Sequence, residues 1–290
     1  MQRNLEFAQI DVFTEQAFCG NQLAVFLDAR GLSTADMQTL AKEMNFAETT
    51  FVLPPEKPGN AARVRIFTTT REMPMAGHPT IGTALVLWER GVLTGDRAML
   101  ELNIGPIAIT IDRGGEDDAL PLVWMTQSAA KFGPVRADRG ATATALGLTT
   151  DDLQGELPIQ MVSTGVPYLL VPLRDRNALQ RARLHQAALS GLFVGEKPMG
   201  VYLFADSADG LRARMFDPTE GLEDPATGSA AGPLACYALQ RGLRSEGRFI
   251  IEQGVEMGRP SEIHVWPEAK GVLVGGRGVI VGRGDIYWNT

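Results

Sequence analysis

The sequence predicts an α+β fold of two pseudo-symmetric lobes, each a rolled, mainly antiparallel β-sheet around a buried central helix. Three observations lead to this prediction: many short runs rich in Val, Ile, Phe and Leu, two helical segments that are apolar on every side, and an internal repeat with an offset of about half the chain. A sheet wrapped around such a helix buries every face of it, which is why this architecture fits the pattern.

In the first half of the chain, β-branched and aromatic runs predict short strands. These strands lie near residues 5–13, 22–28, 49–54, 62–69, 97–103 and 106–112. Between them, STADMQTLAKEMN predicts an amphipathic helix with Ser33 as N-cap and Asp36 three residues later. Its apolar face carries Met37, Leu40, Ala41 and Met44.

After residue 128 the sequence becomes rich in small residues, Gly and charges, which indicates a crossing into a second lobe. The strands expected there lie near residues 158–164, 167–173, 199–205, 211–217, 248–253 and 262–266. We therefore predict lobes at 1–127 and 128–290, with the option that the last strand returns to the first lobe. The segment GVLVGGRGVIVGRGDIYW at 271–288 is typical of strands joined by hairpin turns, and it lacks a dinucleotide-binding motif.

The internal repeat is clearest where RIFTTTREMPMAGHPTIGTALVLWERG can be laid over RMFDPTEGLEDPATGSAAGPLACYALQRG. This superposition places Arg65 on Arg214 and Phe67 on Phe216. Two shorter pieces follow with similar offsets: GNQLAVFL over GVPYLLVP, and ETTFVL over MGVYLF. The sequence thus predicts two copies of one ancestral design.

In each copy the long apolar helix follows a turn, AGHP in the first and DPATG in the second. Pro79 suits a first helical turn, because its missing N–H would be unpaired there. The first N–H groups of a helix and its dipole favour negative charge. We therefore expect a carboxylate-bearing small molecule in a cleft between the lobes, lined by His78 and by residues 224–229.

Composition excludes several other classes of protein. A net charge of −7 and the lack of a Lys/Arg block argue against a nucleic-acid partner. No apolar run approaches the ~20 residues of a membrane span, and the first residues do not resemble a signal peptide, so we expect no membrane partner and a cytoplasmic location. Two cysteines and three scattered histidines have no metal-ligand spacing, so we expect no metal. P-loop and nucleophile-elbow motifs are absent from the sequence.

Several stretches together resemble the signature segments of the PhzF (phenazine-biosynthesis) family, which has the diaminopimelate-epimerase fold. They are IDVFTEQAFCGNQLAVF, NFAETTFVL, RIFTTTREMPMAGHPTIGTA, GLEDPATGSAAGPLA and EQGVEMGRPSEI. The combination of AGHPT with EDPATGS is the specific part of the resemblance. It implies two epimerase-type lobes with a cleft between them, no cofactor, and a homodimer.

The resemblance also implies an activity, the isomerisation of trans-2,3-dihydro-3-hydroxyanthranilate by moving a proton between ring carbons. It places the general acid/base on Glu48, with His78, Asp224 and Ser229 as further catalytic residues that orient the substrate and assist proton transfer. Backbone N–H groups of Gly77, Gly228 and Ser229 would bind its carboxylate. A carboxyl group among apolar walls suits this role, because burial disfavours its charged form.

Each of these residues also has a purely structural interpretation. In this interpretation Glu48 would be a surface glutamate at a strand start, and His78 would be a turn or cap residue. Asp224 would be a cap ahead of Pro225, and Ser229 would be a small packing residue. Glu72 and Glu223 flank the two turns, and we interpret them as structural.

Ala47 precedes Glu48 where members of the family often carry Ser, which leaves the accepted substrate open.

Three functions therefore stay open. The first is a cofactor-free isomerase that shifts a proton on a small carboxylated substrate. The second is an epimerase or racemase that uses Glu48 and Asp224, since neither Cys19 nor Cys236 lies at a helix start where the thiol pair of the epimerases belongs. The third is a binding protein without turnover.

Overall fold

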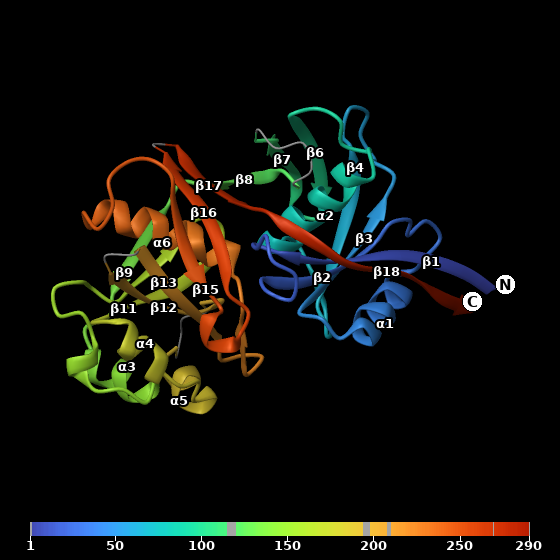
Figure 1. The fold of residues 1–290 in the computed structure, drawn as a ribbon. Helices are drawn as coiled ribbons and strands as arrows, with labels where there is room; N and C mark the ends of the chain where they lie inside the picture. The colour runs from blue at the N-terminus through green and yellow to red at the C-terminus, as the bar shows by residue number, and fades with distance from the viewer. Residues whose placement is uncertain (1, 115–119, 194–197, 208–209, 269, 290) are drawn as a thin grey trace. The chain divides into compact units, whose positions relative to one another are not determined.

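The computed structural model describes residues 2–114, 120–193, 198–207, 210–268 and 270–289 (Figure 1). Contacts divide the chain into two compact units. The first contains residues up to Thr126 together with those from Gly275 onward, and the second contains Gln127–Val274. The chain passes from one unit to the other within strands β8 and β17. No helix among the described residues is long and apolar enough to cross a membrane.

The first unit is a mixed sheet with two helices. Its elements are β1 (Gln2–Val12), β2 (Asn21–Phe26), α1 (Thr34–Met44), β3 (Glu48–Leu53), β4 (Ala62–Phe67), β5 (Glu72–Met73), α2 (Gly77–Glu89), β6 (Arg97–Leu102), β7 (Gly105–Asp112), β8 (Leu122–Ser128) and β18 (Gly278–Asn289). Most neighbours are antiparallel, while β2 pairs with β3 and β4 with β6 in parallel.

The second unit repeats this pattern, and its described residues form four α-helices and two 3₁₀-helices. Its elements are β9 (Lys131–Val135), α3 (Arg139–Ala145), the 3₁₀-helix η1 (Thr150–Asp152), β10 (Gln160–Ser163), β11 (Pro167–Leu173), α4 (Arg176–Arg181), α5 (Gln186–Gly191), β12 (Gly200–Ser207), β13 (Gly210–Asp217), β14 (Leu222–Asp224), α6 (Gly228–Gln240), β15 (Phe249–Gln253), η2 (Val255–Met257), β16 (Ser261–Glu268) and β17 (Gly271–Gly276). Here β11 pairs with β12 and β13 with β15 in parallel, as the repeat requires.

The two long helices are buried all round, as the sequence predicted. Every residue of α2 from Gly77 to Leu87 is buried, and α2 packs on β1, β2, β3 and β18. In the second unit α6 packs on β10, β11 and β16. A Cβ on Gly82 would lie 2.7 Å from the side chains of Leu23 and Val12, so the helix approaches the sheet closely there. The rolled closure of each sheet around its helix stays a prediction.

The opposite face of the first sheet is covered by α1. The predicted capping box is present, because Ser33 Oγ accepts from Asp36 N–H and Asp36 Oδ2 accepts from Ser33 N–H. Met37 and Leu40 of α1 share a core cluster with Phe51 of β3. Side chains alternate along a strand, so Thr50, which hydrogen-bonds to Thr83 of α2 at 2.8 Å, points to the other face.

The hairpin turns predicted for 271–288 are wrong. β18 runs unbroken through Gly282 and Gly284, and it pairs with β1 along its whole length with one irregularity near Gln9. The glycines serve close packing instead of turns. A Cβ on Gly284 would lie 3.1 Å from the ring of Phe7, and one on Gly276 would lie 2.3 Å from the ring of Phe13.

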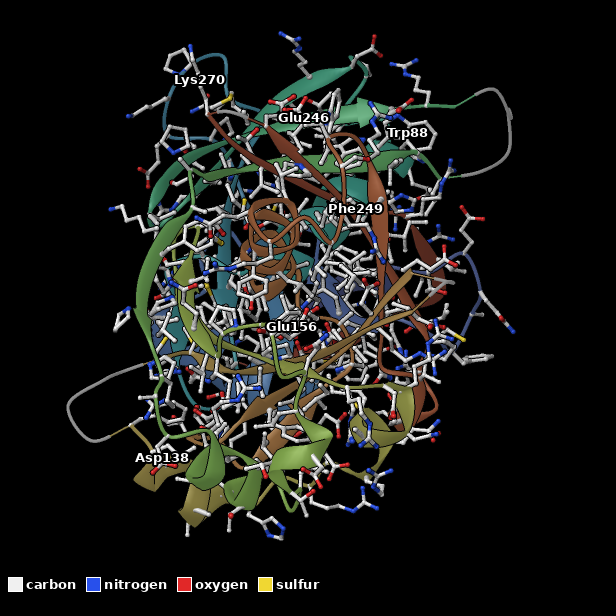
Figure 2. The ribbon with its side chains drawn as sticks, turned by 90° about the vertical axis from the view of Figure 1, so that its left-hand side faces the viewer. Trp88, Asp138, Glu156, Glu246, Phe249 and Lys270 are labelled. Atoms are coloured by element: carbon white, nitrogen blue, oxygen red, sulfur yellow. The ribbon has the colours of Figure 1, made fainter. Side chains whose placement is uncertain are left out.

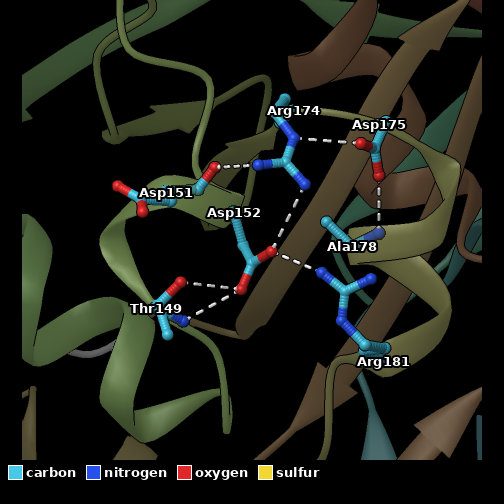
Figure 3. Close-up of polar contacts among 7 residues, drawn as sticks. All are labelled: Thr149, Asp151, Asp152, Arg174, Asp175, Ala178 and Arg181. Carbon is cyan, nitrogen blue, oxygen red and sulfur yellow. Dashed lines mark hydrogen bonds and ion pairs between the residues drawn. The ribbon is translucent and has the colours of Figure 1, made fainter.

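Caps and ion pairs hold α3, η1 and α4 of the second unit. Asp138, labelled in Figure 2, caps α3 by accepting from Ala141 N–H at 2.8 Å. Asp152 of η1 accepts from both the N–H and the hydroxyl of Thr149 and is paired with Arg181 (Figure 3). The hydrogen bond from Thr149 N–H is the main cause that lowers the pKa of Asp152. This network links η1 to α4 and is structural.

Candidate active site

The start of α2 brings His78 and Glu48 together. His78 is the second residue of α2 and is only 5 % exposed, whereas Glu48 begins β3 with a side chain 18 % exposed. The parallel register pairs Glu48 with Leu23, and Glu48 shares with Thr50 the face of β3 that meets α2. As a result, His78 Nε2 lies 3.5 Å from Glu48 Oε2.

The environment of His78 keeps its imidazole neutral. Burial lowers the pKa of His78 to about 3, although a hydrogen bond with the backbone of Gln22 acts in the opposite direction. On the other side of the ring, Nδ1 lies 3.3 Å from Nδ2 of Asn21. Nε2 is buried, and at 3.5 Å its contact with Glu48 is longer than a well-formed hydrogen bond. The contact is therefore one between a neutral imidazole and the Glu48 carboxyl group, and not an ion pair.

In the second unit, Asp224 and Ser229 lie at the start of α6. Asp224 ends β14, and its Oδ2 accepts from the hydroxyl of Thr227 at 2.6 Å. Ser229 is the second residue of α6, and its Oγ lies 2.7 Å from the hydroxyl of Tyr168 on β11. The structure therefore places both predicted residues at one helix start.

Neither long helix uses a side chain to cap its first turn. Ala76 precedes α2, and Thr227 precedes α6 but directs its hydroxyl to Asp224 instead of to the helix. Within the described part of the chain, the first N–H groups of both helices thus have no acceptor from their N-cap side chains. Gly77, Gly228 and Ser229, predicted as carboxylate binders, all lie in these first turns.

Strand registers show which positions of the two units correspond. His78 corresponds to Ser229, because each is the second residue of its long helix. In the parallel ladders, Leu23 pairs with Glu48 in the first unit and Tyr168 pairs with Gly200 in the second. In the antiparallel ladders, Phe67 pairs with Thr49 and Phe216 pairs with Val201. Glu48 therefore corresponds to Gly200. The predicted superposition of ETTFVL on MGVYLF is therefore one residue out of register, because β12 begins at Gly200 and not at Met199.

This register makes the two units chemically different. The second unit carries Gly200 at the position of Glu48, and a Cβ there would lie 2.8 Å from both Met215 Sδ and the Phe216 carbonyl oxygen. No carboxylate fits at that position. The repeat therefore supplies one glutamate, in the first unit only.

Glu72 and Glu223 are structural, as predicted from the sequence. Glu72 forms a two-point ion pair with Arg65, and Glu223 forms the same pair with Arg214. Both arginines also lie over the ring of the phenylalanine two residues later. The repeat has kept this arrangement in both units.

Sequence reasoning missed four residues that lie around the predicted ones. They are Asn21 beside His78, Tyr168 beside Ser229, and Gln253 and Tyr202 in the network around Asp224. Asn21 and Gln253 lie in the segments FCGNQ and EQG, which carry the family resemblance but show no chemical pattern of their own. Only the fold brings them to the helix starts.

Neither cysteine is placed as an acid or base. Cys19 lies in the loop before β2 and is 9 % exposed. Cys236 lies inside α6, and burial raises the pKa of its thiol to about 11. Among the described residues, no group of three or more His, Cys, Asp or Glu side chains is arranged to hold a metal ion.

Comparisons with known proteins support the resemblance over nearly the whole chain. The model of the family described as "Phenazine biosynthesis-like protein" (PhzC-PhzF) matches residues 10–284. The trans-2,3-dihydro-3-hydroxyanthranilate isomerase of Pseudomonas chlororaphis is 38% identical over 285 residues, which cover 96% of this chain and 97% of that protein.

Solved structures agree with these relatives. A predicted epimerase from Pseudomonas aeruginosa superimposes with a TM-score of 0.82 and 36% identity, covering 97% of this chain and 99% of that one. A phenazine biosynthesis protein of the PhzF family from Bacillus anthracis gives a TM-score of 0.86 and 27% identity, covering 98% and 99% of the two chains. The predicted α+β, epimerase-like fold is confirmed.

Proposed function

We propose that this chain, which belongs to the phenazine biosynthesis-like (PhzC-PhzF) family and is an isomerase, moves a proton between carbon atoms of a small carboxylated substrate. In this proposal Glu48 is the acid/base. The Glu48 carboxylate takes a proton from one carbon and returns it to another, and the double bond shifts between them. No atom is gained or lost, so the reaction needs no co-reactant.

The observation that carries this proposal is the contact between Glu48 and a buried, neutral imidazole. A neutral His78 does not hold Glu48 in a permanent ion pair, so the carboxyl group stays able to change its protonation state. The imidazole can still form a hydrogen bond that orients the carboxyl group. The Glu48 side chain is 18 % exposed, so a proton held on it can exchange with solvent.

The second unit contributes to the same reaction in this proposal. Asp224 and Ser229 orient the substrate, and the N–H groups of Gly77, Gly228 and Ser229 bind its carboxylate at the helix starts. The absence of side-chain caps at both helices supports this assignment. We extend the proposal to a homodimer that acts in the cytoplasm, where substrates of small-molecule metabolism are found; light scattering that reports only a monomer would remove the dimer.

The test is proton NMR in deuterium oxide. The wild type and Glu48→Gln are each incubated with trans-2,3-dihydro-3-hydroxyanthranilate and with a panel of small amino and hydroxy acids. We expect deuterium to enter a carbon position of one compound with the wild type and not with Glu48→Gln. Glu43→Gln, at an exposed position of α1, is the matched control and keeps the exchange.

The outcomes separate the three functions. A shifted double bond identifies the isomerase, whereas deuterium at a stereocentre with inversion identifies an epimerase. Exchange that survives Glu48→Gln would assign the base elsewhere. A compound that raises the melting temperature of both variants without any exchange identifies a binding protein.

A further inference from the structure

A buried hydrogen-bond network contacts Asp224 in the second unit. It consists of Asp224, Thr227, Gln253 and Tyr202, which we call the Asp224 network. Gln253 and Tyr202 are fully buried, and Thr227 is 6 % exposed. A Cβ on the next residue, Gly254, would lie 2.5 Å from the carbonyl oxygen of Pro225, so the strand end that carries Gln253 approaches the Asp224 turn very closely.

The amide of Gln253 uses all of its hydrogen-bonding capacity within this network. Its nitrogen donates to the Asp224 carbonyl oxygen at 2.8 Å and to Thr227 Oγ1 at 2.9 Å. Its oxygen accepts from Thr227 N–H at 3.1 Å and from the Tyr202 hydroxyl at 2.8 Å. A buried amide with four satisfied hydrogen bonds has no lower-energy alternative nearby.

Two backbone groups fix the orientation of this amide. The Asp224 carbonyl can only accept, and Thr227 N–H can only donate. Exchanging the nitrogen and oxygen of Gln253 would place like groups against each other at both contacts. The direction of every hydrogen bond in the network therefore follows from the backbone.

The hydroxyl of Thr227 consequently has one arrangement. Because its oxygen accepts from Gln253, its single hydrogen is directed to Asp224 Oδ2 at 2.6 Å. A hydrogen bond this short from a hydroxyl is typical of an ionised acceptor. A proton on that oxygen of Asp224 would face the hydrogen of Thr227.

Tyr202, the titratable group at the other end of the network from Asp224, is consistent with these hydrogen-bond directions. Tyr202 must keep its proton in order to donate to Gln253. Burial raises the pKa of Tyr202 well above its usual value, and the charges of Asp224 and Tyr168 raise it further. The network therefore neither receives a proton from Tyr202 nor passes one to Asp224.

We propose that Gln253 is a positioning residue that fixes the direction of the Thr227 hydroxyl and thereby keeps Asp224 as an ionised, accept-only carboxylate. Asp224 then binds a hydrogen-bond donor of the substrate as a fixed anion and does not carry the transferred proton. The role of Asp224 towards the substrate rests on the proposed function. The positions of the hydrogen atoms in the Asp224 network do not depend on it.

The test follows the carboxyl carbon of Asp224 by NMR in protein labelled with carbon-13 aspartate, with Asp224→Asn to assign its signal. In the wild type we expect the signal of an ionised carboxylate throughout the neutral range. Thr227→Val keeps the shape but removes the donor, so Asp224 should titrate at a pH higher by about one unit or more. Thr227→Ser restores the donor and the wild-type titration.

Gln253→Glu tests the positioning residue itself. An acid at this position offers Thr227 an alternative acceptor, so Asp224 should again titrate at higher pH. Gln160→Glu is the matched control, because Gln160 is a buried glutamine of the same unit that hydrogen-bonds to Gly133 and Arg241 instead. It should leave the Asp224 signal unchanged. Thermal melts identify any variant that does not fold.

The proposal is overturned if Asp224 of the wild type is protonated at neutral pH, or if Thr227→Val titrates as the wild type does. The titration needs no turnover, so it can succeed even if the isomerase proposal fails. Where turnover is measurable, Thr227→Val should raise KM at the acid side of the pH profile more than it lowers kcat.

Discussion

His78 Nε2 lies 3.5 Å from Glu48 Oε2, and this contact joins a fully enclosed imidazole to a carboxyl group that still reaches solvent. Both groups lie at the start of an element, His78 as the second residue of α2 and Glu48 as the first residue of β3, but they differ in burial. α2 is covered by the strands on which it packs, whereas the side chain of Glu48 is 18 % exposed. The pair therefore combines a buried imidazole with a carboxyl group that solvent reaches.

The first prediction concerns the charge of His78. Because burial lowers its pKa to about 3, the ring should stay neutral from pH 8 down to about pH 4. Nitrogen-15 NMR of the imidazoles measures this directly, with His78→Gln to assign the signals. An imidazolium signal from His78 at pH 6 would contradict the neutral pair on which the proposed function depends.

The second prediction is the pH dependence of stability that this burial causes. The unfolded chain protonates His78 below its usual pKa of 6.5, whereas the folded protein does so only near pH 3. The unfolded state therefore binds more protons between these values, and the free energy of unfolding falls as the pH is lowered. The loss is about 1.4 kcal/mol for each pH unit below 6.5, or about 3 kcal/mol at pH 4.5.

Denaturant unfolding at pH 7.5 and pH 4.5 measures this loss. In His78→Gln the part of the loss that comes from His78 should disappear. His185→Gln, at an exposed position, is the control and should keep the wild-type dependence. Equal pH dependence in all three proteins would show that His78 titrates alike in the folded and unfolded states.

The third prediction uses the repeat as its own control. Arg214 and Arg65 occupy corresponding positions, but Arg214 is more buried, with 7 % of its side chain exposed against 16 % for Arg65. Arg214 also donates to the carbonyl oxygens of Leu179 and Ala182, so it holds α4 against β13. Arg65 instead donates to the exposed hydroxyl of Thr34.

Replacing each arginine by Met should therefore have unequal effects. Arg214→Met leaves Glu223 and two carbonyl groups without their donor and should cost about 3–5 kcal/mol of unfolding free energy. Arg65→Met should cost roughly half as much, because water can solvate Glu72 more easily. Denaturant unfolding of both variants tests the order, and an equal cost would mean that the contacts to Leu179 and Ala182 add nothing.

Local signals explain which parts of the fold could be predicted. The capping box and apolar face of α1, and the all-round apolar pattern of α2 and α6, are properties of neighbouring residues, and each predicted the observed element. β9 was missed because KFGPV has small and charged residues and becomes a strand only through pairing with β10.

In the candidate site, too, residues in recognisable local segments could be predicted, whereas residues that act through long-range contacts could not. Glu48, His78, Asp224 and Ser229 lie in recognisable segments, so the sequence alone could propose them. Gln253 could not be proposed, because its role arises from contacts with a turn that lies 26 residues away in the chain. The one-residue error in aligning β3 with β12 has a similar origin, since only the parallel ladders reveal that Glu48 corresponds to Gly200.

The last prediction concerns the cysteines. A two-thiol epimerase, which the sequence disfavours, would need a thiolate near neutral pH, but burial raises the pKa of Cys236 to about 11. Cys19 is 9 % exposed and lies in a loop, outside both helix starts. The double variant Cys19→Ala/Cys236→Ala should therefore keep the deuterium exchange of the wild type, measured by proton NMR on the substrate identified with Glu48→Gln. Cys236→Ala removes only a small, partly buried side chain, so a melting temperature close to that of the wild type serves as the control for folding. Loss of exchange in a folded double variant would transfer the acid/base role from Glu48 to a thiol.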